Sequence, residues 1–295
     1  MAERLLPSGY DVAMVAPDWY AADATASGCP PFVLVQLDAH GRPQPAADRF
    51  PSAMEGCGFA PLAAQVHRLG LRFGVHLTRG IPREAVARGL PIAGSPWRCD
   101  EVANLGSTGA WNSDMCNVNL DHPGAFDWYR AWFAQLTACG VNAAMVDGSA
   151  SPQGHAEEVG LMRRAIEATG RRIDLSLSPS PKFLHQGTWP ELRDDIVNLL
   201  ERSSQAPPDD WPCAGVLNAS GDGLGKGDGA HDPRLTRDEQ MLMLTAWACA
   251  RRPLVLGGDL RRMDDWTLHL VTNPDVLAFL RAPGRREWQA FAEGH

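Results

Sequence analysis

The residue of this chain best placed to do chemistry is a carboxylate at the end of an apolar segment. A helix is expected to end at Gly140, and the apolar run over residues 141–146 has the length and composition of a strand buried on both faces. Asp147 follows this run directly. Because the chemistry of α/β proteins lies at the carboxyl ends of parallel strands, Asp147 is a candidate nucleophile or base. The alternative is a strand-end carboxylate that only caps the next turn.

Short apolar segments alternate with helical patterns along the rest of the chain. Strands are predicted over residues 10–16, 71–77, 141–146, 173–178 and 252–257. Helices are predicted over residues 59–69, 125–139, 155–169, 188–200, 238–250, 263–268 and 274–280. A further short helix over residues 81–88 is placed in a long loop that runs to about residue 120.

This alternation predicts an α/β protein with a parallel sheet. A (β/α)-barrel fits better than a doubly wound sheet, because no glycine-rich phosphate-binding fingerprint follows the first strand. The length of 295 residues suits one large domain. We therefore predict a single barrel domain of catalytic type over residues 1–295, with a hairpin excursion near residues 30–45.

Composition and charge exclude several function classes. The net charge of -8, without a run rich in Lys or Arg, argues against a nucleic-acid partner. No apolar run reaches the roughly 18–20 residues of a membrane span, so no membrane partner is expected. The first residues do not resemble a signal peptide, which predicts a cytoplasmic protein.

The cysteines and histidines do not form a metal site or a redox site in the sequence. The seven Cys residues are scattered and no two form a C-x-x-C pair, so buried thiols in a reducing compartment are expected. The histidines never pair at ligand spacing on one predicted helix. The sequence predicts no metal and no cofactor.

Several motifs together resemble the α-galactosidase family of retaining glycoside hydrolases, family 27 and its clan. They cover nearly the whole chain, and they include Arg49-Phe-Pro-Ser52, Gly70-Leu-Arg-Phe-Gly-Val-His76, Trp111-Asn-Ser-Asp-Met115, Arg252-Pro-Leu-Val-Leu-Gly-Gly-Asp-Leu-Arg261 and Leu270-Val-Thr-Asn-Pro-Asp-Val276. Another motif, Arg79-Gly-Ile-Pro-Arg83, is shared with a bacterial branch, and the scarcity of Lys beside Arg is typical of high-GC genomes. A bacterial source is therefore expected.

The resemblance implies a (β/α)8 TIM-type barrel and a double-displacement reaction on O-glycosidic bonds of galactosides. In such a reaction one carboxylate attacks the anomeric carbon, and a second carboxyl group about 5–5.5 Å away protonates the leaving oxygen. Asp147 falls on the position of the nucleophile. The resemblance also implies a set of sugar-binding residues, of which the aromatic ones could stack on the ring and the polar ones bind its hydroxyls: Asp18, Trp19, His76, Trp111 and Asp114.

A purely structural role is the alternative for these binding residues. His76 could be a core histidine whose hydrogen bonds are made within the protein, and Trp111 and Asp114 could serve only to pack their loop. Asp259 is interpreted as a helix cap ahead of Leu260 rather than as a ligand.

The chain departs from the family pattern where the sugar and the acid should be held. Met145 occupies the position of a lysine two residues before the nucleophile, and Ala16 and Pro17 replace acidic residues. The acid/base is not in its expected place. Its only substitutes are Asp195, in a segment where a solvated helix face is the better interpretation, and His185.

These departures suggest an incomplete barrel. When the motifs are matched to the family pattern, the first strand of the barrel is absent and the sixth strand is shortened or missing. The family's C-terminal β domain is lacking as well. We therefore expect the chain to be either a fragment or a trimmed barrel. The leading hypothesis is a retaining glycosidase of α-galactosidase type with Asp147 as nucleophile and Asp195 as acid/base. The alternative is a catalytically impaired pseudoenzyme that binds sugars or another partner. A carbohydrate ligand is expected in both cases, and the oligomeric state is left open.

Overall fold

The structure, a computed structural model, describes ten segments of the chain. These are residues 1–22, 34–55, 58–108, 114–147, 152–177, 193–194, 196–197, 217–219, 235–250 and 254–281. The chain divides into two compact units: Gly9–Ser178 with Ala2, and Pro179–His295 with Met1 and Glu3–Ser8. The single domain predicted over residues 1–295 stays a prediction.

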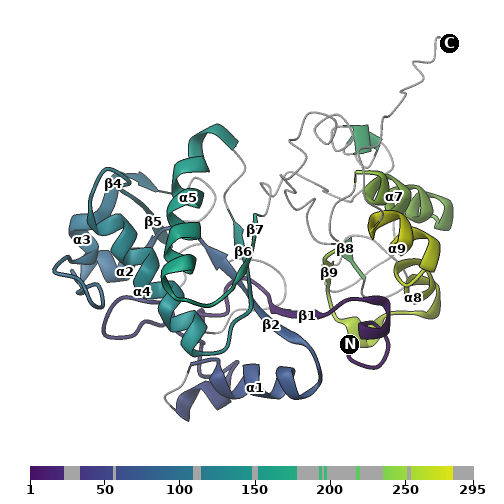
Figure 1. Ribbon diagram of the computed structural model, residues 1–295, viewed down its shortest axis with the longest axis horizontal. Coiled ribbons are helices and arrows are strands. Elements are labelled where there is room, and N and C mark those ends of the chain that lie inside the picture. Colours follow the sequence, from purple (N-terminus) through teal and green to yellow (C-terminus); the bar gives the residue numbers. More distant parts are fainter. Residues whose placement is uncertain are drawn as a thin grey trace, which may run out of the picture. The chain divides into compact units, whose positions relative to one another are not determined.

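A parallel sheet forms the centre of the 9–178 unit. Its strands β1 (Val12–Val15), β2 (Arg72–Thr78), β6 (Ala143–Asp147) and β7 (Asp174–Leu177) lie in the order β1-β2-β6-β7, and every pair is parallel (Figure 1). All four strands were predicted from their apolar runs. The α/β class with a parallel sheet is confirmed.

The helices that lead into these strands end at glycines, as predicted. Helix α1 (Ala60–Arg68) precedes β2, α4 (Gly124–Ala138) precedes β6, and α5 (Pro152–Ala168) precedes β7. At the joint after α4, Gly140 has a φ of 82° and its N–H donates to the carbonyl oxygen of Thr137 at 3.0 Å. Residues with a side chain rarely adopt this left-handed conformation, so glycine lets the chain turn from α4 to β6 within residues 139–142.

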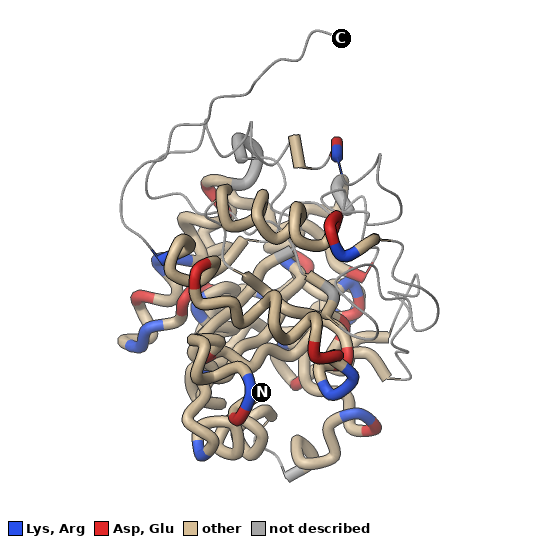
Figure 2. The backbone as a smooth tube through the Cα atoms, turned by 90° about the vertical axis from the view of Figure 1, so that its right-hand side faces the viewer, with Lys and Arg blue, Asp and Glu red and all other residues tan. Residues whose placement is uncertain are grey.

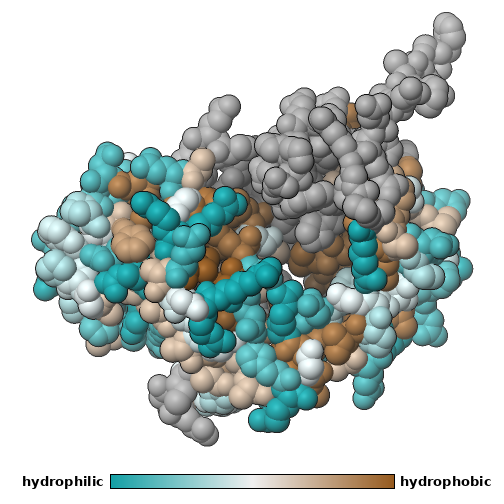
Figure 3. Space-filling model, in the orientation of Figure 1, coloured by the Kyte–Doolittle hydropathy of each residue, from teal (hydrophilic) through white to brown (hydrophobic). Residues whose placement is uncertain are grey.

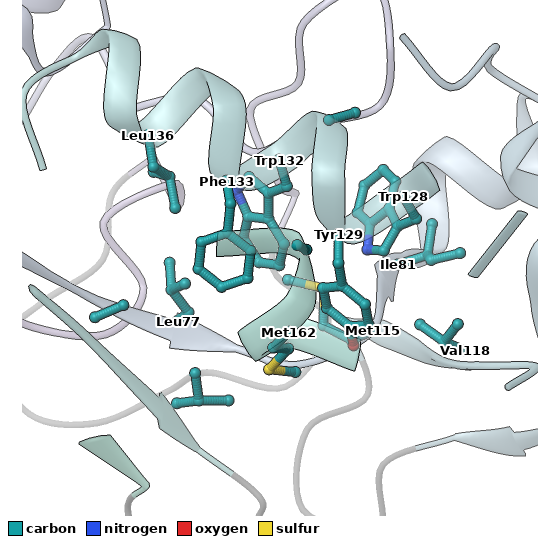
Figure 4. Packing of buried hydrophobic residues seen from close by; sticks show 14 of the residues in the cluster. Leu77, Ile81, Met115, Val118, Trp128, Tyr129, Trp132, Phe133, Leu136 and Met162 are labelled. Carbon is teal, nitrogen blue, oxygen red and sulfur yellow. The ribbon is translucent and has the colours of Figure 1, made fainter. Parts of the chain in front are cut away.

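One face of the sheet packs against α4 and α5 to form the core. Figure 4 shows Trp128, Tyr129, Trp132 and Phe133 pointing from α4 toward residues such as Leu77 and Met162. Phe73, Val75 and Leu77 of β2 all belong to this cluster, and all are at most 2% exposed. Because side chains alternate along a strand, Gly74, His76 and Thr78 face the opposite side of the sheet.

The opposite face is closely packed near the amino end of the strands. A Cβ atom added to Gly74 would lie 3.0 Å from Cε of Met14, 3.1 Å from Cγ1 of Val12 and 3.4 Å from Cβ of Ala143. The glycine therefore makes room for side chains of both neighbouring strands. A filled layer of this kind is what the inside of a (β/α)-barrel requires.

The predicted long loop up to residue 120 is wrong, because an antiparallel sheet forms there. Its strands β3 (Ile81–Pro82), β4 (Ala103–Thr108) and β5 (Met115–Val118) lie in the order β3-β5-β4, together with the helices α2 (Arg83–Ala87) and α3 (Cys99–Val102). Strand β4 reads Ala-Asn-Leu-Gly-Ser-Thr and has a register shift between Asn104 and Thr108. Such a segment has no apolar alternation from which a strand could be predicted.

Part of the hairpin predicted near residues 30–45 lies within the described residues. Leu37 and Pro43 form an antiparallel bridge, and Asp38 Oδ1 accepts the backbone N–H of His40 at 2.8 Å and of Arg42 at 3.0 Å. Residues 23–33 lie outside the described segments.

Within the described residues, the other unit contains a short parallel pair of strands and the helices α7 (Arg237–Cys249), α8 (Asp265–Val271) and α9 (Pro274–Arg281). Strands β8 (Leu217–Asn218) and β9 (Leu256–Gly257) pair in parallel. The Asp259 side chain accepts the N–H of Arg261 at 3.1 Å and caps the 3-10 helix Leu260–Arg262, which confirms its interpretation as a cap. Within the described segments, no helix has both the length and the apolar character that a membrane span needs.

Charged residues of both signs are interspersed along the described chain (Figure 2). Polar and apolar residues also alternate over the face shown in Figure 3. Buried thiols are found at Cys99 and Cys116, and burial raises the pKa of the Cys99 thiol to about 12. This thiol is therefore protonated at neutral pH, as expected of a packing residue rather than a reactive one.

Arg72 links β2 to β7 and to the residue that precedes β1, at the amino end of the sheet. Its Nε lies 2.9 Å from Oδ2 of Asp11, and its Nη1 contacts Asp174, which also lies 2.7 Å from Nε of Arg172. Burial acts to raise the pKa of Asp174, but the hydrogen bonds from Arg72 and Arg172 outweigh it, and the pKa is lowered.

Arg72→Met is expected to destabilise the protein in a pH-dependent way. Because the folded-state pKa of Asp174 is lowered, its stabilising contribution is complete above the unfolded value of about 3.9 and is lost as pH falls through the folded value. We expect a loss of about 0.5–1 kcal/mol at pH 7, the range for partly exposed pairs, and a smaller loss near pH 3. Urea unfolding of both proteins at the two pH values measures this. A loss that is equal at both would contradict the assignment.

Candidate active site

Asp147 is the last residue of β6 and lies at the carboxyl edge of the parallel sheet. The register pairs it with Thr78, the last residue of β2, while Val146 pairs with Leu177 at the end of β7. The position predicted from the sequence, directly after an apolar strand, is therefore found in the backbone. Its role as a nucleophile stays a prediction.

His76 and Met145 are neighbours across β2 and β6, two residues before Thr78 and Asp147. Both are buried, His76 to 8% and Met145 to 2% exposure. Neither belongs to the cluster under α4 and α5. Met145 stands where the family resemblance places a lysine, and a buried thioether can neither donate a hydrogen bond nor supply a positive charge beside a carboxylate.

Asp18 is held at the same edge by the loop that follows β1. Its side chain is buried, and the Tyr20 hydroxyl donates to its Oδ1 at 3.3 Å while also lying 3.2 Å from Oγ1 of Thr78. Arg49 Nη1 donates to the carbonyl oxygen of Asp18 at 2.6 Å. Asp18 is thus connected through Tyr20 to Thr78, the register partner of Asp147.

The backbone of Asp18 is strained. Its φ of 59° is the one positive value outside glycine among the described residues. This conformation is uncommon for residues with a side chain, although Asp and Asn tolerate it best, and such strain gathers at functional sites. Tyr20 and Arg49, which hold Asp18, were not identified from the sequence as site residues. The aromatic pair Trp19-Tyr20 was the available signal for Tyr20.

Trp19 lies in the core and not on the surface. It is 1% exposed, its ring centroid lies 4.9 Å from that of Phe59 and 5.4 Å from that of Tyr20, and its N–H donates to the carbonyl oxygen of His76 at 2.7 Å. Stacking on a sugar would require an open ring face. These contacts favour an anchoring role for Trp19, which fixes the loop after β1 onto β2.

The other predicted site residues are only partly covered by the described segments. Asp114 is buried just before β5, and its carbonyl oxygen accepts the N–H of Arg83 at 2.8 Å. Trp111 and Asp195 lie outside the described segments. The neighbouring Asp194 is exposed and pairs with Arg193 at 2.9 Å, as expected on a solvated helix face. No group of three potential metal ligands occurs within the part of the chain that the structure describes.

A buried ion pair directly follows β2 and was not found from the sequence. Arg79 Nη1 lies 2.8 Å from Oε2 of Glu158, whose side chain is 3% exposed, and the Tyr129 hydroxyl donates to Oε1 of Glu158. Burial, followed by the negative charge of Glu158, raises the pKa of Tyr129 well above its ordinary value. Because the three residues come from distant segments, no local motif could have indicated them.

Solved structures of a β-L-arabinopyranosidase from Geobacillus stearothermophilus resemble this chain closely. The wild-type enzyme and a variant in complex with arabinose superpose with TM-scores of 0.85 and 0.84. Each is 36% identical to this chain, and the match covers 95% of this chain and 70% of the other. No family model matches the chain.

Curated α-galactosidases match over shorter stretches. The chain is 26% identical to α-galactosidase 3 of Hypocrea jecorina over 204 residues, which is 65% of this chain and 28% of that protein. It is 33% identical to α-galactosidase 2 of Arabidopsis thaliana over 76 residues, or 16% of that protein. The matches thus span less than a third of the curated relatives. The similarity to the arabinopyranosidase covers almost the whole chain, and it implies a catalytic domain of the (β/α)8 barrel type. The chain belongs to glycoside hydrolase family 27.

Proposed function

We propose that this protein is a retaining glycoside hydrolase that acts on O-glycosidic bonds of galactosides, with Asp147 as its nucleophile. The observation that carries the proposal is the position of Asp147 at the carboxyl end of β6, in register with Thr78. A nucleophilic carboxylate at this position of a parallel α/β sheet can attack an anomeric carbon held above the strand ends. Membership of family 27 supports the same reaction class.

The sugar is expected to be galactopyranose or arabinopyranose, the pentose that corresponds to it. The two kinds of relative are named for galactosides and for β-L-arabinopyranosides. Arabinopyranose differs from galactopyranose by the lack of the exocyclic hydroxymethyl group. A substrate set for this protein must therefore include both sugars.

Whether the barrel lacks strands stays a prediction, since most of residues 178–216 lie outside the described segments.

We expect turnover to depend strongly on the leaving group. The acid/base is not in its expected place, with Asp195 as its candidate substitute, and general acid catalysis typically contributes about 10²–10⁴-fold. The nitrophenolate released from nitrophenyl α-galactoside or nitrophenyl β-L-arabinopyranoside needs little protonation to leave. These substrates should therefore be hydrolysed faster than the matching methyl glycosides by about this factor. Steady-state rates measure the ratio. A ratio near one would show that an efficient acid is present.

The stereochemistry of the first product tests the mechanism itself. Proton NMR of the fresh hydrolysate should show the sugar released with the anomeric configuration of the substrate. Inversion would contradict a nucleophilic role for Asp147.

A sugar-binding pseudoenzyme is the second candidate, and Met145 is the observation that favours it. A buried methionine replaces the expected lysine, and Ala16 and Pro17 follow β1 where acidic residues are expected. In this case the wild-type protein should turn over none of the glycosides, while titration calorimetry still detects binding of galactose or arabinose. Turnover that depends on Asp147 would rule this candidate out.

A further inference from the structure

A single buried carboxylate connects three separate segments of the 9–178 unit. Glu158 of α5 accepts a hydrogen bond from the Tyr129 hydroxyl of α4 and forms an ion pair with Arg79 at 2.8 Å. The side chains of Glu158 and Arg79 are 3% and 12% exposed, and Tyr129 is completely buried. Figure 4 shows the Tyr129 ring beside Met115 and Met162. We refer to Arg79, Tyr129 and Glu158 as the Glu158 network.

The three segments all adjoin the end of β6. Helix α4, with Tyr129, leads into β6, and α5, with Glu158, is the helix that follows it. Arg79 comes directly after Thr78, which is the register partner of Asp147. The carboxylate therefore links both helices that flank β6 to the chain beside its last residue.

We propose that the Glu158 network is a positioning device that holds the carboxyl end of β6, and with it Asp147, in the geometry needed for attack. The proposal rests on the function proposed above for Asp147. None of the three residues is assigned a contact with substrate. They act through the backbone of β2 and β6, so they are positioning residues and not catalytic ones.

Stability alone is a poor reason for such a network. Burying an ion pair costs desolvation energy, and apolar residues of similar volume often stabilise a protein as well or better. The same helices already bury a large apolar surface through Trp132, Phe133 and Met162. Charged hydrogen bonds add direction, because they fix the relative placement of donor and acceptor more narrowly than apolar contacts do. Burial also keeps the Tyr129 hydroxyl protonated, since its pKa is raised, and therefore able to donate.

The experiment compares Tyr129→Phe and Glu158→Gln with Arg72→Met in the full chain. Arg72 is the matched control, because it forms an ion pair at the opposite end of the same strand, β2. With nitrophenyl α-galactoside or nitrophenyl β-L-arabinopyranoside as substrate, the two network variants should lose on the order of 10- to 100-fold in kcat, as expected for a misplaced reacting group. KM should change by less than about twofold, because only the geometry of the attacking group is altered. Arg72→Met should keep the wild-type kcat.

Hydrogen exchange provides a second measurement that does not need activity. Amides of residues 143–147 should lose protection in Tyr129→Phe and Glu158→Gln, whereas those of residues 12–15 should not. Arg72→Met should leave the protection of residues 143–147 unchanged. Unchanged protection in both network variants would overturn the proposal, whatever their activity.

An apolar triple variant separates positioning from stability. Arg79→Met, Tyr129→Phe and Glu158→Met together remove the charges and the hydroxyl while keeping most of the volume, so the protein should fold even if Glu158→Gln does not. We expect its melting temperature to return close to that of wild type while kcat and the protection of residues 143–147 stay low. Recovery of kcat and protection along with the melting temperature would overturn the proposal.

The proposed function and this inference can fail separately. A wild-type protein that hydrolyses no glycoside would contradict the proposed function, and hydrogen exchange at residues 143–147 would still decide whether the network holds the end of β6.

Discussion

Asp147→Asn is expected to reduce kcat/KM for a nitrophenyl glycoside by on the order of 10³-fold or more, to the level of the background reaction. The amide has nearly the same shape as the carboxylate, but it carries no negative charge and cannot form a stable ester with the sugar. The position at the end of β6, next to the end of β2, is where the family's nucleophile is expected. Binding of the free sugar should change little, since only the attacking group is altered.

Mass spectrometry gives an independent measure of the same role. A retaining mechanism passes through a glycosyl-enzyme ester, so the wild-type protein with an activated substrate should carry one sugar on the peptide that contains Asp147. Asp147→Asn should show no such adduct. Asp100→Asn serves as a control, because Asp100 is a partly exposed carboxylate of α3 that lies near Arg98. Wild-type activity in Asp147→Asn would remove Asp147 from the mechanism.

Trp128→Ala is expected to cause the largest loss of stability among single substitutions in the core, about 3–5 kcal/mol in the free energy of unfolding. Trp128 is completely buried, its ring lies 5.8 Å from that of Trp132, and its N–H donates to the carbonyl oxygen of Gly80 at 3.1 Å. The substitution leaves a cavity under α4, and it removes the hydrogen-bond donor of the Gly80 carbonyl oxygen, which follows β2. Urea unfolding at pH 7 measures the loss.

Two milder substitutions test the same packing. The Trp132 N–H has no hydrogen-bond partner among the described residues, whereas that of Trp128 has one. Trp132→Phe should therefore cost less than Trp128→Phe, because it removes a buried donor that makes no bond. Leu105→Ala, at a position that is 69% exposed, should change stability by less than about 0.5 kcal/mol. A loss for Trp132→Phe equal to that for Trp128→Phe would contradict the role of the bond to Gly80.

The parallel sheet could be predicted from the sequence because its signals are local. Each strand is a short apolar run, and α1, α4 and α5 each end at a glycine just before the next strand. The runs in β1 and β6 are apolar on both faces, as expected of strands that are covered on both sides, whereas β2 and β7 alternate apolar residues with polar residues or glycine. The position of Asp147 at a strand end follows from the same local pattern.

The antiparallel sheet and the contacts of the site could not be predicted in this way. Strands β3, β4 and β5 are short and polar in places, and they are specified by pairing with one another rather than by their own composition. The family resemblance implied a sugar-binding role for Trp19, and no local pattern indicated that its ring packs against Phe59 in the core. Burial of an aromatic ring stabilises the protein by several times the free energy of a local turn preference.

The antiparallel sheet lies in the chain between β2 and β6, which are adjacent strands of the parallel sheet. This position determines where segments can be inserted or deleted. Gly74 pairs with Ala143, whereas Ala143 pairs with Asp174, so the crossover from β2 to β6 is more than twice as long as that from β6 to β7. The entropy of closing a loop rises only slowly with its length, by about 0.6 kcal/mol for each doubling. A whole subdomain can therefore be inserted between two adjacent strands at small cost. This crossover is the place in the 9–178 unit where segments could be gained, lost or exchanged while the pairing of β2 with β6 is kept.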